Sequence, residues 1–94
     1  MTFSLSEGAR KDLIDSEEYY DQQYFGLGLE FLDEGHDVIT RICESPEIWQ
    51  IIYKDVRRCY FNRFPFHIIY RIREKQIEII AIAHNKRKPN YWKK

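Results

Sequence analysis

The sequence predicts an α+β fold of two layers, in which a pair of helices packs on one face of a mainly antiparallel sheet. Apolar residues recur at helical spacing through the first half of the chain, whereas the second half contains segments with the patterns of strands. Short turn signals separate those segments, and strands that tight turns join must be antiparallel. The expected order is β-α-α-β-β-β in a single domain that spans residues 1–94.

The first half is expected to form a short strand and a helical hairpin. Residues 2–5 are half apolar, and Ser6 follows them as a helix N-cap. An amphipathic helix then runs to about Gln23, after which two glycines interrupt the pattern. A second helix carries an apolar stripe over residues 31–43, and Pro46 ends it because proline disfavours a continued helix.

The second half is expected to form three strands. Residues 48–53 are a short apolar run whose type the period does not decide, and we interpret them as a loop that enters the first strand. The strands, with their turns at Asn62-Arg63 and Glu74-Lys75, are Val56 to Tyr60, Phe64 to Arg73 and Gln76 to His84. The second strand alternates and has one buried face, whereas the apolar run in the third suits a strand covered on both faces.

The formal net charge of zero hides two halves of opposite charge. Residues 1–50 carry twelve acidic and three basic side chains, a balance of minus nine, and residues 51–94 carry twelve basic and three acidic ones, a balance of plus nine. A protein that competes for RNA usually has a large positive excess, because phosphate neutralisation supplies most of its affinity. The absence of that excess favours a protein target over an RNA target.

The cysteines and the N-terminus indicate a cytoplasmic protein. Cys43 and Cys59 lack CxxC spacing and lie in apolar settings, so we interpret both as reduced, structural thiols. No cationic start precedes a long apolar segment, and no apolar run reaches the length that a bilayer span requires. We therefore expect no membrane contact.

Four motifs in order resemble the RelE/ParE superfamily, the toxins of type II toxin–antitoxin modules. They are the pair Arg57-Arg58, the segment from Phe64-Pro65-Phe66 to Tyr70, His84 with Arg87, and Pro89 with Tyr91-Trp92. The resemblance covers nearly the whole chain. It implies a growth-arresting toxin, as in plasmid stabilisation, that a cognate antitoxin neutralises in a toxin–antitoxin hetero-oligomer.

The superfamily has two main activities. ParE-like members poison DNA gyrase through a protein contact, whereas RelE-like members cut messenger RNA on the ribosome. Because of the charge balance, we favour ParE-like gyrase inhibition, with ribosome-dependent, metal-independent endoribonuclease activity as the alternative. A non-toxic binding protein that retains the fold is a second alternative. The chain is an enzyme only in the RelE-like case, and no cofactor or metal is expected in any case.

If the chain is RelE-like, its catalytic groups should lie near the end of the last strand and on neighbouring strands. Attack by the RNA 2′-hydroxyl requires a general base, cations near the phosphorane and a proton donor for the leaving oxygen. The residues that match these roles are His84, Arg87, Tyr91, Arg71 and Arg58. A structural role is the competing interpretation for His84, and we interpret His67 as a surface residue first and a site residue second.

If the chain is ParE-like, its functional elements are contact surfaces. The positive half predicts that antitoxin carboxylates pair with Arg57, Arg58, Arg71, Arg73 or Arg87. Exposed aromatic residues anchor protein interfaces, and the predicted target interface is Tyr19, Tyr24, Phe25, Tyr91 and Trp92. The competing interpretation is that the last two rings fold the tail over the sheet and cap the core. Both hypotheses assume that Arg71, His84, Arg87 and Tyr91 lie along a single rim.

Overall fold

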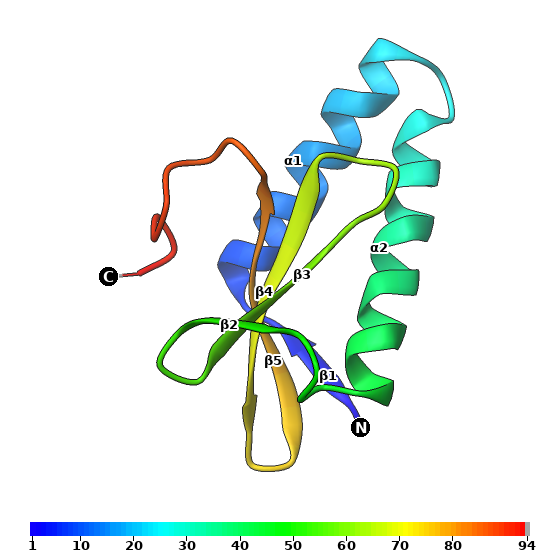
Figure 1. Cartoon of the computed structure of the whole chain (residues 1–94). Helices are drawn as coiled ribbons and strands as arrows, with labels where there is room; N and C mark the ends of the chain where they lie inside the picture. Colours follow the sequence, from blue (N-terminus) through cyan, green and yellow to red (C-terminus); the bar gives the residue numbers. More distant parts are fainter. Residues whose placement is uncertain (94) are drawn as a thin grey trace.

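The computed structural model describes residues 1–93 and confirms the two-layer α+β fold (Figure 1). Its elements, in chain order, are β1 (Phe3–Leu5), α1 (Glu7–Gln23), α2 (Leu27–Glu44), β2 (Gln50–Tyr53), β3 (Val56–Tyr60), β4 (Phe66–Arg73) and β5 (Gln76–His84). The sheet order is β1-β5-β4-β3-β2, in which β1 runs parallel to β5 and the other neighbours are antiparallel. The helices lie on one face of the sheet, and the C-terminal tail passes over the other (Figure 1).

Two strand boundaries differ from the sequence prediction. The apolar run expected as a loop contains β2, where Gln50 lies opposite Arg58 in an antiparallel pair. Its pairing partner, rather than its own period, makes this run a strand. In addition, β4 begins at Phe66 instead of Phe64. Pro65 has no N–H to donate to a strand partner, and the Phe66 N–H donates to the Phe64 carbonyl at 2.8 Å.

The larger core lies between the helices and the sheet. Phe31, Val38 and Ile42 of α2 are fully buried against sheet residues such as Ile68 and Tyr70. Burying one such side chain stabilises the fold by roughly 1.5–3 kcal/mol. The Tyr70 hydroxyl donates a 2.6 Å hydrogen bond to the Pro46 carbonyl, so its one polar atom is satisfied.

A smaller apolar cluster occupies the opposite face of the sheet. Val56, Ile69, Ala81 and Ala83 are buried there, beneath tail residues 91–92. Strand β5 therefore contributes apolar side chains to both faces, as its uninterrupted apolar run predicts.

An irregularity in β5 decides which of its side chains face the tail. Ile69 of β4 lies opposite Ala81, but the next residue, Tyr70, lies opposite Ile79, so Ile80 is an extra residue in β5. Such a bulge inverts the alternation of side chains beyond it. Ile79 and Ile82 both face the helices as a result, although their numbers differ in parity.

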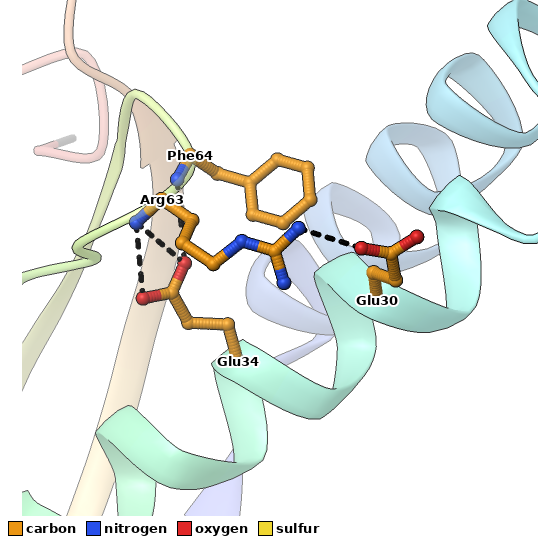
Figure 2. A network of polar contacts seen from close by, with 4 residues as sticks. All are labelled: Glu30, Glu34, Arg63 and Phe64. Carbon is orange, nitrogen blue, oxygen red and sulfur yellow. Dashed lines mark hydrogen bonds and ion pairs between the residues drawn. The ribbon is translucent and has the colours of Figure 1, made fainter.

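Carboxylates of α2 hold the loop between β3 and β4 (Figure 2). Glu34 accepts hydrogen bonds from the backbone N–H groups of Asn62 (2.7 Å), Arg63 (3.0 Å) and Phe64 (3.3 Å). The Arg63 guanidinium group pairs with Glu30 at 2.6 Å. The turn expected at Asn62-Arg63 is therefore a longer loop, which joins Tyr60 to Phe66. Two of the acidic side chains on the helices, Glu30 and Glu34, bind this loop.

The cysteines pack as the sequence predicts. Cys59 is buried and Cys43 is half-buried, and burial raises the pKa of both thiols. Both therefore remain protonated at neutral pH, where they act as small packing groups. Among residues 1–93, no helix combines the length and apolar character that a membrane crossing requires.

Candidate functional site

A groove on the tail-covered face collects several of the predicted cations. It has a volume of about 390 Å³ and lies between β2, β3, β4 and the tail. Arg58, His67, Arg87 and Lys88 line it, together with Tyr91. None of the described residues that line the groove is acidic, so its potential is positive.

Two arginines in the groove are held in place by neutral neighbours. The Arg58 Nε donates to the Gln50 side chain at 3.0 Å, and its guanidinium group lies 5.0 Å from the Tyr60 ring centre. The Arg87 guanidinium group lies 3.9 Å above the ring of Tyr91. Stacking on a ring fixes a guanidinium group without neutralising it. Within residues 1–93, neither arginine forms an ion pair, so both can receive an external anion.

The other predicted arginines lie elsewhere. Arg57 faces away from Arg58, as strand alternation predicts, and donates to the carbonyls of Glu47 and Trp49 at 2.9 Å. Arg71 lies near the other end of the sheet and pairs with Glu78 at 2.8 Å. Arg73 is exposed at the end of β4. Only Arg58 and Arg87 of the five share the groove.

The prediction of a single rim is wrong. His84 lies opposite Phe66, with ring centres 5.2 Å apart, and Phe66 belongs to the helix-side core. Residues directly opposite in a strand pair share a face, so His84 faces the helix side, whereas Arg87 and Tyr91 line the groove on the other side. The bulge at Ile80 is the physical reason, because it inverts the alternation ahead of His84.

His67 corrects a second expectation. The sequence pattern assigns it to the surface, but it is only 9% exposed and lines the groove. Its Nδ1 lies 2.8 Å from the side-chain oxygen of Asn85. Burial lowers the pKa of His67, so it is neutral at pH 7. The tail buries it, and residues 85–92 show no strand or helix period from which the sequence could reveal this cover.

The aromatic residues of the tail are anchored to the domain. The Tyr91 hydroxyl donates to Oδ2 of Asp12 at 3.1 Å, and the same oxygen accepts the Ile82 N–H at 3.0 Å. Burial, followed by the Asp12 charge, raises the pKa of Tyr91 far above its usual value. Trp92 is half-buried against the sheet and packs edge-on to Tyr53. These rings cap the smaller cluster, in agreement with the competing interpretation.

The three predicted interface residues on the helical hairpin, by contrast, are largely exposed. Tyr24 is 73% exposed and Phe25 is 91% exposed in the connection between α1 and α2, which forms the free end of the hairpin (Figure 1). Tyr19 is 59% exposed on the last turns of α1, and its ring touches the partly buried Tyr20. The predicted target interface therefore divides into an exposed group and an anchored group.

Three comparisons with known proteins bear on the family and the fold of this chain. The model of the family described as "ParE toxin of type II toxin-antitoxin system, parDE" matches residues 3–89. The proteins named Toxin ParE2 from two Mycobacterium tuberculosis strains, CDC 1551 / Oshkosh and ATCC 25618 / H37Rv, are each 29% identical over 90 residues, which covers 92% of this chain and 83% of each relative.

Among solved structures, a chain described as "Chromosomal ParDE TA system from P. aeruginosa" superposes with a TM-score of 0.67 at 19% identity. The superposition covers 89% of this chain and 95% of that chain, and it supports the fold described above. Because the family match spans nearly the whole domain, this chain belongs to the ParE toxins of type II toxin–antitoxin systems.

Proposed function

We propose that this toxin arrests growth through ParE-like contact with DNA gyrase in the cytoplasm, without cutting RNA. The dispersal of the expected catalytic groups is the main support, because a protein contact, unlike RNA cleavage, does not require the single rim that both hypotheses assumed. A ribonuclease requires its acid, base and cations around one phosphodiester. Here His84 lies on the helix-side face and Arg71 is paired with Glu78. The Tyr91 hydroxyl is bonded to Asp12, with a pKa too high for efficient proton transfer at neutral pH.

The proposal includes a cognate antitoxin that binds the groove. The matching family and the structural neighbour from P. aeruginosa are both described as parts of a toxin–antitoxin system. Arg58 and Arg87 lack a carboxylate partner among the described residues, and an acidic antitoxin segment would supply one. Arg57 and Arg71 already have partners and should contribute less. Arg73 has no ion pair within residues 1–93 but lies outside the groove, so the predicted antitoxin set narrows to Arg58 and Arg87.

One observation favours RelE-like cleavage as the second candidate. The groove is lined by a buried neutral histidine, His67, and by two arginines that lack acidic partners among residues 1–93. A neutral imidazole can accept a proton, and guanidinium groups stabilise phosphorane charge. In that case the general base would be His67 instead of His84.

Two assays separate the candidates. The purified wild-type chain should inhibit supercoiling of relaxed plasmid by gyrase, and its expression without antitoxin should arrest growth. Messenger RNA from arrested cells should show no new breaks at ribosomal A-site codons. Breaks that disappear in His67→Ala or Arg87→Ala, with supercoiling unaffected, would establish the RelE-like activity instead. Growth without arrest would leave only the non-toxic binding protein.

The antitoxin contact has its own test. Arg58→Glu with Arg87→Glu should weaken antitoxin binding by roughly 100-fold or more, because two charge-assisted contacts become repulsive. Arg73→Glu is the matched control, since it reverses an exposed arginine outside the groove. Equal antitoxin affinity of the wild type, the Arg58→Glu/Arg87→Glu double variant and Arg73→Glu would contradict this part of the proposal.

A further inference from the structure

The free end of the helical hairpin exposes large apolar side chains on a fixed backbone. Phe25 and Tyr24 project from the connection, and Leu29, in the first turn of α2, is 62% exposed. These three residues are called the tip below. Aromatic side chains this exposed have little contact with their own domain, and they are the residue type that most often anchors protein interfaces.

Several contacts make the backbone of the tip rigid. Oδ1 of Asp21 accepts the N–H groups of Gly26 (3.0 Å) and Gly28 (3.3 Å), so a carboxylate on α1 caps the start of α2. Gly26 adopts a left-handed conformation with φ of 89°, which glycine adopts without strain. A Cβ atom at Gly28 would lie 2.7 Å from the Glu17 carbonyl oxygen, so the helices approach closely there. The tip thus loses little conformational entropy on binding.

The surroundings of the tip are acidic. Residues 12–40 contain no lysine or arginine, and their nine acidic residues are Asp12, Asp15, Glu17, Glu18, Asp21, Glu30, Asp33, Glu34 and Asp37. Arg63 of the β3–β4 loop neutralises only one of them, Glu30, among the ion pairs of residues 1–93 that involve α2. A complementary partner must therefore offer an apolar pocket with basic residues around it. A second copy of this chain, joined tip to tip, would bring like charges together and is disfavoured.

We propose that the tip inserts into an apolar pocket with a basic rim on the toxin's target, with Phe25 as the central anchor. This inference rests on the proposed function, in which the target is DNA gyrase, an enzyme that binds phosphate backbones through basic surfaces. The anchored tail rings, Tyr91 and Trp92, take no part in this contact because the smaller core cluster needs them.

The test compares the double variant Tyr24→Ser/Phe25→Ser with Ile48→Ser. Ile48 is 70% exposed in the connection between α2 and β2, so it is a matched apolar control outside the tip. Binding to immobilised DNA gyrase and inhibition of supercoiling are measured for each, and circular dichroism melting verifies the fold. The double variant should bind roughly 30-fold or more weakly, as expected for the loss of an interface hot spot, while Ile48→Ser binds as the wild type does.

A charge variant tests the basic rim. Glu18→Lys should slow association with gyrase several-fold at low salt, and the difference should shrink at high salt because screening removes it. Inhibition by the wild type and the double variant alike would overturn the inference and leave the proposed function standing. No inhibition by the wild type would overturn both. A wild-type dimer in sedimentation that the double variant abolishes, with gyrase inhibition unchanged, would assign the tip to self-association and also overturn the inference.

Discussion

The hairpin tip and the C-terminal tail carry similar aromatic residues, but the domain uses them in opposite ways. Tyr24 and Phe25 stand in solvent on a backbone that Asp21 fixes. Tyr91 and Trp92 pack on the sheet, where Asp12 holds the Tyr91 hydroxyl. The two regions together make up the target interface that the sequence predicts, but the side chains of the tip are largely exposed, whereas those of the tail are half-buried.

The contrast between the two regions shows that aromatic rings close to an uncovered apolar sheet face pack on that face, whereas rings far from it stay exposed. The helices protect one face of the sheet, so the apolar residues on the other face require a cover from the tail. Ala81 and Ala83 are small, which leaves space for the two tail rings above them. The connection between α1 and α2 extends beyond the end of the sheet (Figure 1), and its two rings, Tyr24 and Phe25, are correspondingly exposed.

The largest expected difference between the regions concerns stability. Tyr91→Ala/Trp92→Ala should lower the free energy of unfolding by roughly 2–4 kcal/mol, because it uncovers the smaller cluster and leaves a cavity. Tyr24→Ser/Phe25→Ser should change it by less than about 0.5 kcal/mol, as for exposed positions. Urea denaturation followed by circular dichroism measures both. Equal losses would show that the tip is also part of the packed structure.

Alkaline pH should reveal the buried phenols. Burial raises the pKa of Tyr70 to about 12 and raises that of Tyr91 further, whereas both ionise near 10 in the unfolded chain. Because the pKa of each phenol is higher in the native state than in the unfolded chain, the two neutral phenols contribute to the free energy of unfolding. This contribution is fully present below pH 10 and is lost as the pH rises above 10. Ionisation of Tyr70 in the unfolded chain should by itself lower the free energy of unfolding by about 2 kcal/mol at pH 12.

Denaturant melts between pH 9 and pH 12 test this expectation, with Tyr91→Phe as the companion variant. The variant should lose stability less steeply over that interval, since one raised phenol is gone. A slope identical to that of the wild type would mean that Tyr91 is solvated, and the contrast between tail and tip would weaken.

The two carboxylates that organise these regions should differ modestly in their effects. Asp12→Ala removes the acceptor of the Tyr91 hydroxyl and of the Ile82 N–H, and should cost roughly 1–3 kcal/mol of unfolding free energy. Asp21→Ala removes the cap of α2 and should cost about 1 kcal/mol. Thermal melts compare the two.

The same pair of variants separates the functions of the two regions. Asp21→Ala should weaken gyrase binding several-fold through a less ordered tip, whereas Asp12→Ala should leave the affinity of the folded protein unchanged. If Asp12→Ala weakened gyrase binding and Asp21→Ala did not, the target contact would lie at the tail instead of the tip.

The smallest expected effect concerns the surface ion pair of the β3–β4 loop (Figure 2). Glu30→Gln should change the free energy of unfolding by less than about 1 kcal/mol. The Glu30–Arg63 ion pair is exposed, and water and salt weaken the attraction between exposed charges. Glu34→Gln, which weakens an acceptor of three backbone N–H groups, should cost more. Chemical denaturation at low and high salt distinguishes these contributions.

The elements of this fold can be predicted well from the sequence because their signals are local. Helical spacing identifies α1 and α2, alternation identifies β4, and an apolar run identifies β5, while turn residues separate β3, β4 and β5 from one another. Strand β2 is harder, because four residues carry too little period and its identity depends on pairing with β3.

The candidate site is harder to predict because long-range contacts define it. The extra residue Ile80 turns His84 away from the groove, and no local pattern marks a bulge that depends on strand register. Asp12 is 70 positions from Ile82 and 79 from Tyr91, and its role follows only from the packed fold. The tail then buries His67, which alternation alone assigns to the surface.

Hydrogen exchange of the toxin with and without DNA gyrase tests the central claim most directly. If the tip carries the contact, backbone amides of residues 17–30 should gain protection on binding, and those of residues 85–93 should exchange as they do in the free toxin. Protection confined to the tail, with the tip unchanged, would contradict this account of how the toxin meets its target.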